Sequence, residues 1–142
     1  MQQSKNKANG FSVYKLTKAE CEELFRKQNA VLKNTYPHKG ARGYSAAVLT
    51  IKGNIYEGAS YESDTQSLTM HGEAVALTHA NLHGESEIVA ITGPNCHICK
   101  QLIWENSLRS KIDIVVIIKE DNQIKQIPIS KLMPYPWPEK LN

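Results

Sequence analysis

The sequence predicts an α/β fold in which helices flank a mixed sheet whose last strand runs antiparallel. After residue 86, strand-like and helix-like segments alternate, which is typical of parallel strands joined by crossover helices. The polar turn at 120–123 is too short for such a crossover, so the strand that follows it is predicted to run antiparallel. The 142 residues suit one domain, expected at 11–142, with residues 1–10 disordered.

A helix is predicted to begin near Thr17. Thr17 and Glu20 form a T-x-x-E capping box, in which each side chain accepts a hydrogen bond from an otherwise free backbone N–H. Cys21 lies on the apolar stripe of this helix, which favours core packing over metal binding. The helix is predicted to end before Pro37, because the residue before a proline disfavours helical geometry.

The elements of the sheet follow from hydrophobic pattern and turn residues. Segments 44–51 and 55–60 are predicted as strands, and the turn at 52–54 is short enough to pair them as a hairpin. The apolar, β-branched run 112–118 predicts a strand buried on both faces. The remaining predicted elements are a helix from residue 73, a strand at 88–92, a helix at 96–107 and a strand at 124–127.

Composition and charge are ordinary for a globular protein, with 41% hydrophobic residues and a net charge of +3. Residues 1–42 hold nine basic and three acidic side chains, which could indicate a nucleic-acid footprint. The basic side chains are scattered, however, so we favour a solvated helix face and a basic tail. The N-terminal stretch has no apolar signal region, and the longest apolar run, 114–118, is too short to span a bilayer. A cytoplasmic protein with no membrane partner is therefore expected.

Two short motifs carry the chemistry. Three cysteines, two of them in a C-x-x-C pair (Cys96 and Cys99), indicate a metal or redox site in a reducing compartment. With His71 they make a three-ligand zinc set, which leaves the fourth position open for water and so indicates a catalytic site. Glu73, two residues after His71, is predicted to reach that water without binding the metal and to move protons. The site needs no organic cofactor.

The pattern H-x-E…P-C-x-x-C resembles the zinc-dependent cytidine deaminase superfamily over roughly residues 15–141. The nearest types are the small homotetrameric cytidine deaminases and the blasticidin S deaminases. The resemblance implies a three-layer cytidine deaminase-like fold with a five-stranded mixed sheet, and a homo-oligomer, either a tetramer or a dimer. The segment 132–141 resembles the tail that packs at a neighbouring subunit's active site in the small enzymes.

The resemblance also implies an activity and residue roles. A hydrolase of the cyclic-amidine type is expected, which deaminates cytidine or deoxycytidine in pyrimidine salvage. Zn²⁺ would activate a water for attack at C4 of the base, and Glu73 would carry protons to N3 and to the departing ammonia. Glu62 matches the acid that binds the ribose hydroxyls, with Ser60 beside it, and Arg42 is a candidate contact for the substrate.

This sequence departs from the family pattern at five positions. His71 stands where the small enzymes have a cysteine, so the metal centre loses one negative charge. Lys100 replaces an arginine that offsets that charge in the family. Asn95 stands between Pro94 and the first cysteine of the pair, Ser60 replaces a ribose-binding asparagine, and Arg42 replaces a phenylalanine. Arg42 could accept a phosphate, although a plain loop arginine is the reading we favour.

Three alternatives stay open on the sequence. The chain could be a related deaminase with another substrate, such as a cytosine-nucleoside antibiotic of the blasticidin S type, because residues 42, 60 and 95 depart from the family pattern. The domain could be a zinc-stabilised binding module without catalysis, although Glu73 argues against that. A polynucleotide deaminase is disfavoured, because those enzymes place a helix between their last two strands where this chain has a short turn. A free nucleoside, and no nucleic acid, is therefore the expected partner.

Overall fold

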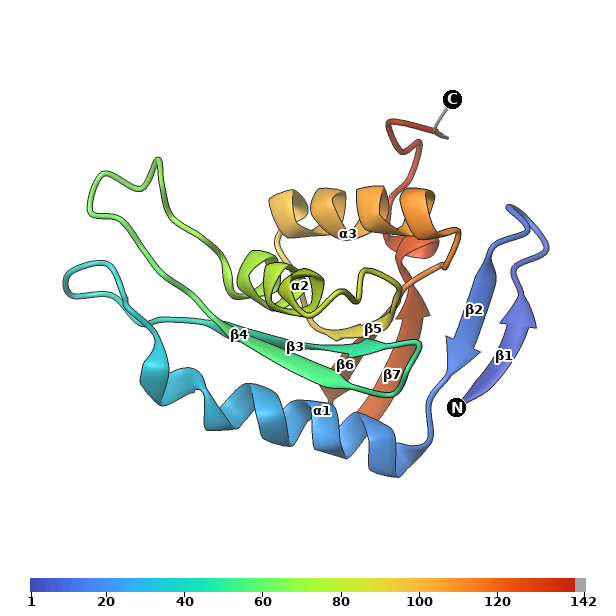
Figure 1. Ribbon diagram of the computed structural model, residues 1–142, viewed down its shortest axis with the longest axis horizontal. Coiled ribbons are helices and arrows are strands. Elements are labelled where there is room, and N and C mark those ends of the chain that lie inside the picture. The colour runs from blue at the N-terminus through green and yellow to red at the C-terminus, as the bar shows by residue number, and fades with distance from the viewer. Residues whose placement is uncertain (140–142) are drawn as a thin grey trace.

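A five-stranded mixed sheet organises the chain. The computed structural model describes residues 1–139, and in it the strand order is β4-β3-β5-β6-β7 (Figure 1). β3 runs antiparallel to β4 and β5, β5 runs parallel to β6, and β7 runs antiparallel to β6. This confirms the predicted mixed sheet and its antiparallel last strand. The strands are β3 Ser45–Thr50, β4 Ile55–Ala59, β5 Ile88–Thr92, β6 Val115–Glu120 and β7 Gln123–Pro128.

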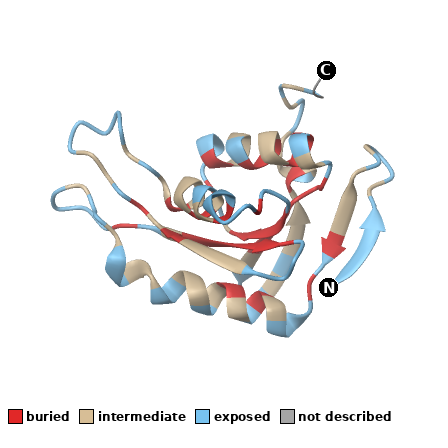
Figure 2. Cartoon of the chain, in the orientation of Figure 1, coloured by how far each residue is buried: buried red, intermediate tan, exposed pale blue. Residues whose placement is uncertain are grey.

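Helices cover both faces of the sheet. α1 (Lys18–Ala30) packs on one face, and α2 (Gly72–Leu82) and α3 (His97–Ser110) pack on the other (Figure 1). Each face has its own cluster of buried apolar side chains, and β5 is buried along its whole length (Figure 2). None of the helices within residues 1–139 has the length and apolar character that a membrane crossing requires.

The connection between β6 and β7 is shorter than the sequence indicates. Asp121 and Asn122 alone form the turn, with φ values of 51° and 61°. Positive φ at both central residues matches the tight hairpin turns whose twist suits antiparallel strands. β6 itself begins at Val115 rather than at Ile112, because Ile112 instead bridges to Ser12 of the N-terminal segment.

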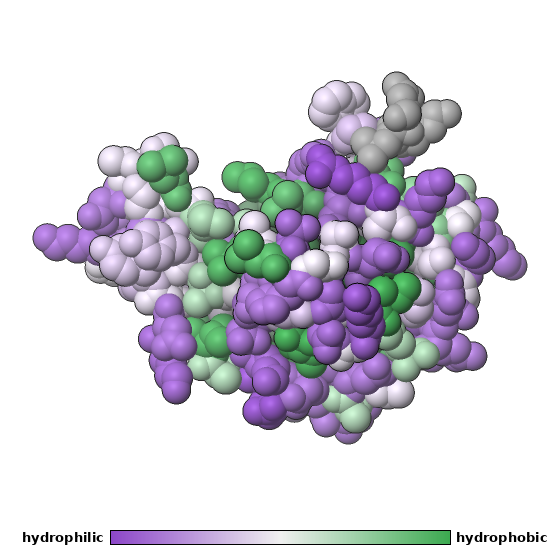
Figure 3. All heavy atoms as spheres, in the orientation of Figure 1, coloured by the Kyte–Doolittle hydropathy of each residue, from purple (hydrophilic) through white to green (hydrophobic). Residues whose placement is uncertain are grey.

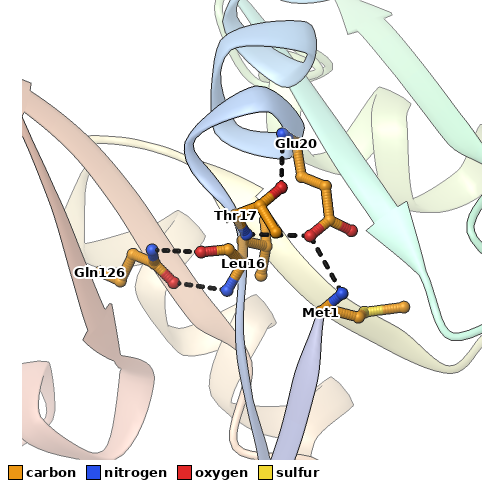
Figure 4. Close-up of polar contacts among 5 residues, drawn as sticks. All are labelled: Met1, Leu16, Thr17, Glu20 and Gln126. Atoms are coloured by element: carbon orange, nitrogen blue, oxygen red, sulfur yellow. Dashed lines mark hydrogen bonds and ion pairs between the residues drawn. The ribbon is translucent and has the colours of Figure 1, made fainter.

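The N-terminal ten residues, expected to be disordered, include an ordered strand. β1 (Gln2–Lys5) pairs antiparallel with β2 (Ser12–Lys15). Several contacts hold this hairpin against the domain, among them backbone hydrogen bonds of Ser12 with Lys111 and Asp113. The Met1 amine lies 3.1 Å from Glu20 Oε1, and Figure 4 draws this ion pair. The Asn6 side chain donates a 2.6 Å hydrogen bond to Asp113, which is fully buried.

The start of α1 is as predicted. Thr17 accepts a hydrogen bond from the Glu20 N–H, and Glu20 accepts one from the Thr17 N–H, so the capping box is complete (Figure 4). Cys21 is fully buried in the cluster under α1, as expected for a core residue. Short 3-10 helices occupy Leu32–Asn34 and Ile129–Leu132. The tail interpretation extends to Lys140 and Leu141, which lie outside the described residues.

Candidate active site

The starts of α2 and α3 bring three predicted metal ligands together. His71 is the N-cap residue of α2, Cys96 is the N-cap residue of α3, and Cys99 lies in the first turn of α3. His71 Nδ1 is 3.4 Å from Cys96 Sγ and 3.2 Å from Cys99 Sγ. Within residues 1–139 this is the one cluster of three or more potential ligands, and its ligand atoms lie within 4.8 Å of one another.

The donor set fits zinc. In a tetrahedral zinc site the sulfur and imidazole nitrogen ligands lie about 3.5 Å apart, given Zn–S near 2.3 Å and Zn–N near 2.0 Å. The two observed N···S distances, 3.4 and 3.2 Å, are close to that value. The Cys99 N–H also points at Cys96 Sγ, 3.5 Å away, at the positive end of the helix dipole. The cluster could therefore hold one zinc ion with a coordination position left over.

The electrostatics of Cys99 also favour a cation at this place. Burial, followed by the negative charge of Glu73, raises the pKa of the Cys99 thiol. A thiolate at this buried position is consequently unfavourable unless a positive charge compensates for it. A divalent cation held by the three ligands would supply that charge.

Glu73 lies next to the cluster without joining it. It is in the first turn of α2 and half-buried. Its Oε2 accepts a 2.9 Å hydrogen bond from Asn95 Nδ2. Its negative charge helps to raise the pKa of the Cys99 thiol, as expected for a carboxylate near the ligand set. This arrangement suits a group that moves protons at the metal rather than one that binds the metal.

Two glycines let α2 approach the sheet closely enough to set this geometry. A Cβ on Gly58 of β4 would lie 2.2 Å from the backbone N of Ala76 and 2.3 Å from the carbonyl O of Gly72. A Cβ on Gly72 would lie 2.8 Å from Cα of Ser45 in β3. Neither glycine can be found as a site determinant from the sequence, because the restriction comes from the neighbouring backbone.

The predicted sugar-binding residues differ in their surroundings. Ser60 is 3% exposed, and its Oγ accepts a 3.0 Å hydrogen bond from the Tyr44 N–H and donates one of 3.0 Å to Glu62 Oε2. Tyr36 steadies the same segment, since its ring stacks on that of Tyr61 with the centroids 4.4 Å apart. The structure thus brings Ser60 and Glu62 together, and Arg42 is exposed in the loop that precedes β3.

Lys100 and Asn95 are two further positions at which this sequence departs from the family pattern. Lys100 is half-buried, and its backbone N–H donates to the Cys96 carbonyl in the first turn of α3. Asn95 is 8% exposed and hydrogen-bonded to Glu73. Sequence reasoning identified Asn95 as an intrusion but missed this bond. The only signal in the sequence was the break in the P-C-x-x-C pattern.

Comparison with solved structures identifies the architecture. Cytidine deaminase from Burkholderia pseudomallei superposes with a TM-score of 0.71 at 20% identity, covering 86% of this chain and all of that one. The fold is that of the cytidine deaminases. The enzymes from Mycobacterium tuberculosis and Bacillus anthracis give TM-scores of 0.68 and 0.62, at 16% and 18% identity. They cover 82% and 84% of this chain, and 95% and 90% of their own.

Sequence similarity points to the same group of proteins. Cytidine deaminase of Shewanella baltica is 36% identical over 95 residues, which are 63% of this chain and 30% of that protein. The chain thus spans less than a third of the length of the curated relatives that it matches. No protein-family model matches the chain. This chain therefore combines the fold of the cytidine deaminases with a ligand cluster, and Glu73 beside it, at the starts of α2 and α3.

Proposed function

We propose that this protein is a zinc-dependent hydrolase that deaminates cytidine or deoxycytidine to the uridine form with release of ammonia. The observation that carries the proposal is the cluster of His71, Cys96 and Cys99 with Glu73 beside it and outside it. Its similarity in sequence to cytidine deaminases, within the same fold, supports this substrate class.

Each protein group has a separate task in this reaction. His71 Nδ1 and the two cysteine thiolates would hold zinc, which lowers the pKa of a bound water and so supplies a nucleophile at neutral pH. Glu73 accepts the two protons of the attacking water one after the other, and it passes the first to N3 of the ring and the second to the departing amine. Water is added at C4 and ammonia leaves, so the reaction needs no oxidant or organic cofactor.

Glu62 binds the sugar of the substrate in this proposal. The carboxylate of Glu62 can accept hydrogen bonds from sugar hydroxyls, while the buried Ser60 hydroxyl already serves Glu62 and Tyr44. Ser60 thus contributes by holding Glu62 in place. Lys100 contributes positive charge next to the cysteine ligands.

Replacing Ser60 by alanine is expected to raise KM for cytidine about tenfold, since one hydrogen bond to a charged group is lost. The value of kcat should change less, because Ser60 does not touch the ligand cluster. Steady-state kinetics on purified protein measures both. Ser67→Ala, at the exposed tip of the same loop, is the control and should leave KM unchanged.

A substrate panel tests the function itself. Cytidine, deoxycytidine, CMP and blasticidin S are incubated with purified protein, and ammonia release is measured. Turnover of cytidine or deoxycytidine is the expected result. Turnover of blasticidin S alone would replace the proposed substrate with a nucleoside antibiotic, and strong, salt-sensitive binding to single-stranded nucleic acid would redirect the proposal to a polynucleotide.

Removing the metal is expected to stop ammonia release and to lower the melting temperature. A ligand present at about 1,000 times its Kd stabilises the folded state by about 4 kcal/mol, and chelation removes that contribution. Added zinc should restore both properties. Cys99→Ser should lose zinc in the same assay, whereas Cys21→Ala should keep it, because Cys21 lies in the core under α1.

A homo-oligomer, either a tetramer or a dimer, belongs to the same proposal. Large apolar side chains of α2 and α3 stay exposed in the single chain, among them Leu82 at 85% and Ile98 at 74%. In Figure 3 apolar groups reach the surface over α2 and at the loop that precedes it. Sedimentation analysis measures the assembly state. The cytoplasmic location expected from the sequence stays a prediction.

A further inference from the structure

We propose that Asn95 is a positioning residue for Glu73, which ties the proton-carrying carboxylate to the end of strand β5. This inference rests on the proposed deaminase function, in which Glu73 moves the protons. It assigns a role to the residue that breaks the P-C-x-x-C pattern.

The side-chain amide of Asn95 makes two hydrogen bonds through the same nitrogen. Nδ2 donates to Glu73 Oε2 at 2.9 Å and to the carbonyl O of Thr92 at 3.0 Å. Thr92 is the last residue of β5 and is buried. Both partners are acceptors, so a flipped amide would place its own oxygen against two oxygens. The contact therefore specifies one orientation of the amide and one position of the carboxylate oxygen.

The oxygen of the Asn95 side-chain amide, in contrast to the nitrogen, makes no hydrogen bond with the residues that the structure describes. Asn95 is 8% exposed, and its Oδ1 is buried with no hydrogen-bond partner within the described part of the chain. A buried acceptor without a partner destabilises the folded protein by about 1–3 kcal/mol. Such a local cost is typical of functional sites, where a side chain is retained for the contact that it makes.

Positioning matters here because Glu73 must serve several atoms in turn. It has to face the attacking water, N3 of the base and the leaving amine while staying outside the ligand set. With Oε2 held by Asn95, the other carboxylate oxygen of Glu73 can occupy only a narrow range of positions beside the cluster. Without the tether, the side chain gains rotamers that point away from the substrate, and catalysis falls while ground-state binding persists.

Kinetics of Asn95→Ala and Asn95→Asp give the first test. We expect Asn95→Ala to lower kcat about 10–100-fold, with KM for cytidine within about twofold and zinc near one per chain. Asn95→Asp should be slower still, because a carboxylate would then face both Glu73 and the Thr92 carbonyl. Asn54→Ala is the matched control: Asn54 also donates a 2.9 Å bond to a glutamate, Glu85, at the far hairpin turn, and its loss should leave kcat unchanged.

The side-chain amide signals of Asn95 give a test that is independent of turnover. In ¹H–¹⁵N spectra these signals should shift in Glu73→Ala and stay in place in Glu62→Ala. Unshifted signals, a wild-type kcat in Asn95→Ala, or loss of zinc from that variant would each overturn the proposal. A wild-type protein that deaminates no nucleoside would overturn the proposed function, and the tether would then be judged on the amide signals alone.

Discussion

Replacing Glu73 by alanine is expected to abolish measurable ammonia release from cytidine while bound zinc stays near one per chain. Glu73 is the one group that the mechanism uses to move protons, and positioned proton transfer contributes about 10²–10⁴-fold to a rate. The carboxylate lies beside the ligand cluster but contributes no ligand atom to it, so the metal site should survive its removal.

Activity and zinc content must be measured on the same preparation. Glu73→Gln is the matched variant, since it keeps the shape of the side chain and loses the base. It should be as inactive as Glu73→Ala. Glu57→Ala, on β4, removes a carboxylate outside the cluster and should retain activity. If Glu73→Ala lost its zinc, the division between ligand and proton carrier would be wrong.

Replacing Gly58 by alanine is expected to destabilise the protein by about 3 kcal/mol or more, at the upper end of overpacking effects. The added Cβ would lie 2.2 Å from the Ala76 backbone N and 2.3 Å from the Gly72 carbonyl O. Backbone atoms of a helix cannot rotate out of the way, so α2 must move off β4. His71 and Glu73 stand at the start of that helix, and zinc affinity should therefore fall together with stability.

Thermal or denaturant unfolding measures this effect. Gly53→Ala is the control: Gly53 has φ +86° in the hairpin turn, with nothing within 4 Å of an added Cβ. An alanine there is strained by about 1–2 kcal/mol but meets no atoms. We expect Gly58→Ala to be the more destabilised of the two and the only one with weakened zinc binding. Equal destabilisation with unchanged zinc binding would show that α2 is not held by this contact.

Much of the fold followed from local patterns and from loop length. The antiparallel last strand was predictable because the polar turn leaves no room for a crossover helix. The capping box of α1 was predictable because Thr17 and Glu20 satisfy each other's backbone within one turn. The N-terminal hairpin was missed, because its polar strand Gln2–Lys5 shows no alternation and a long-range contact, Asn6 with Asp113, helps to hold it.

The sequence by itself determined the candidate metal ligands and the proton carrier. Few residue types bind zinc, so their spacing at predicted helix starts was enough to single out His71, Cys96 and Cys99. The tertiary structure alone decided how Asn95 and Ser60 are used. Amides and hydroxyls can hydrogen-bond to many partners, and the partner is chosen only when distant segments meet. The close approach of α2 to Gly58 was likewise decided by packing, because a missing side chain has no meaning until another backbone lies against it.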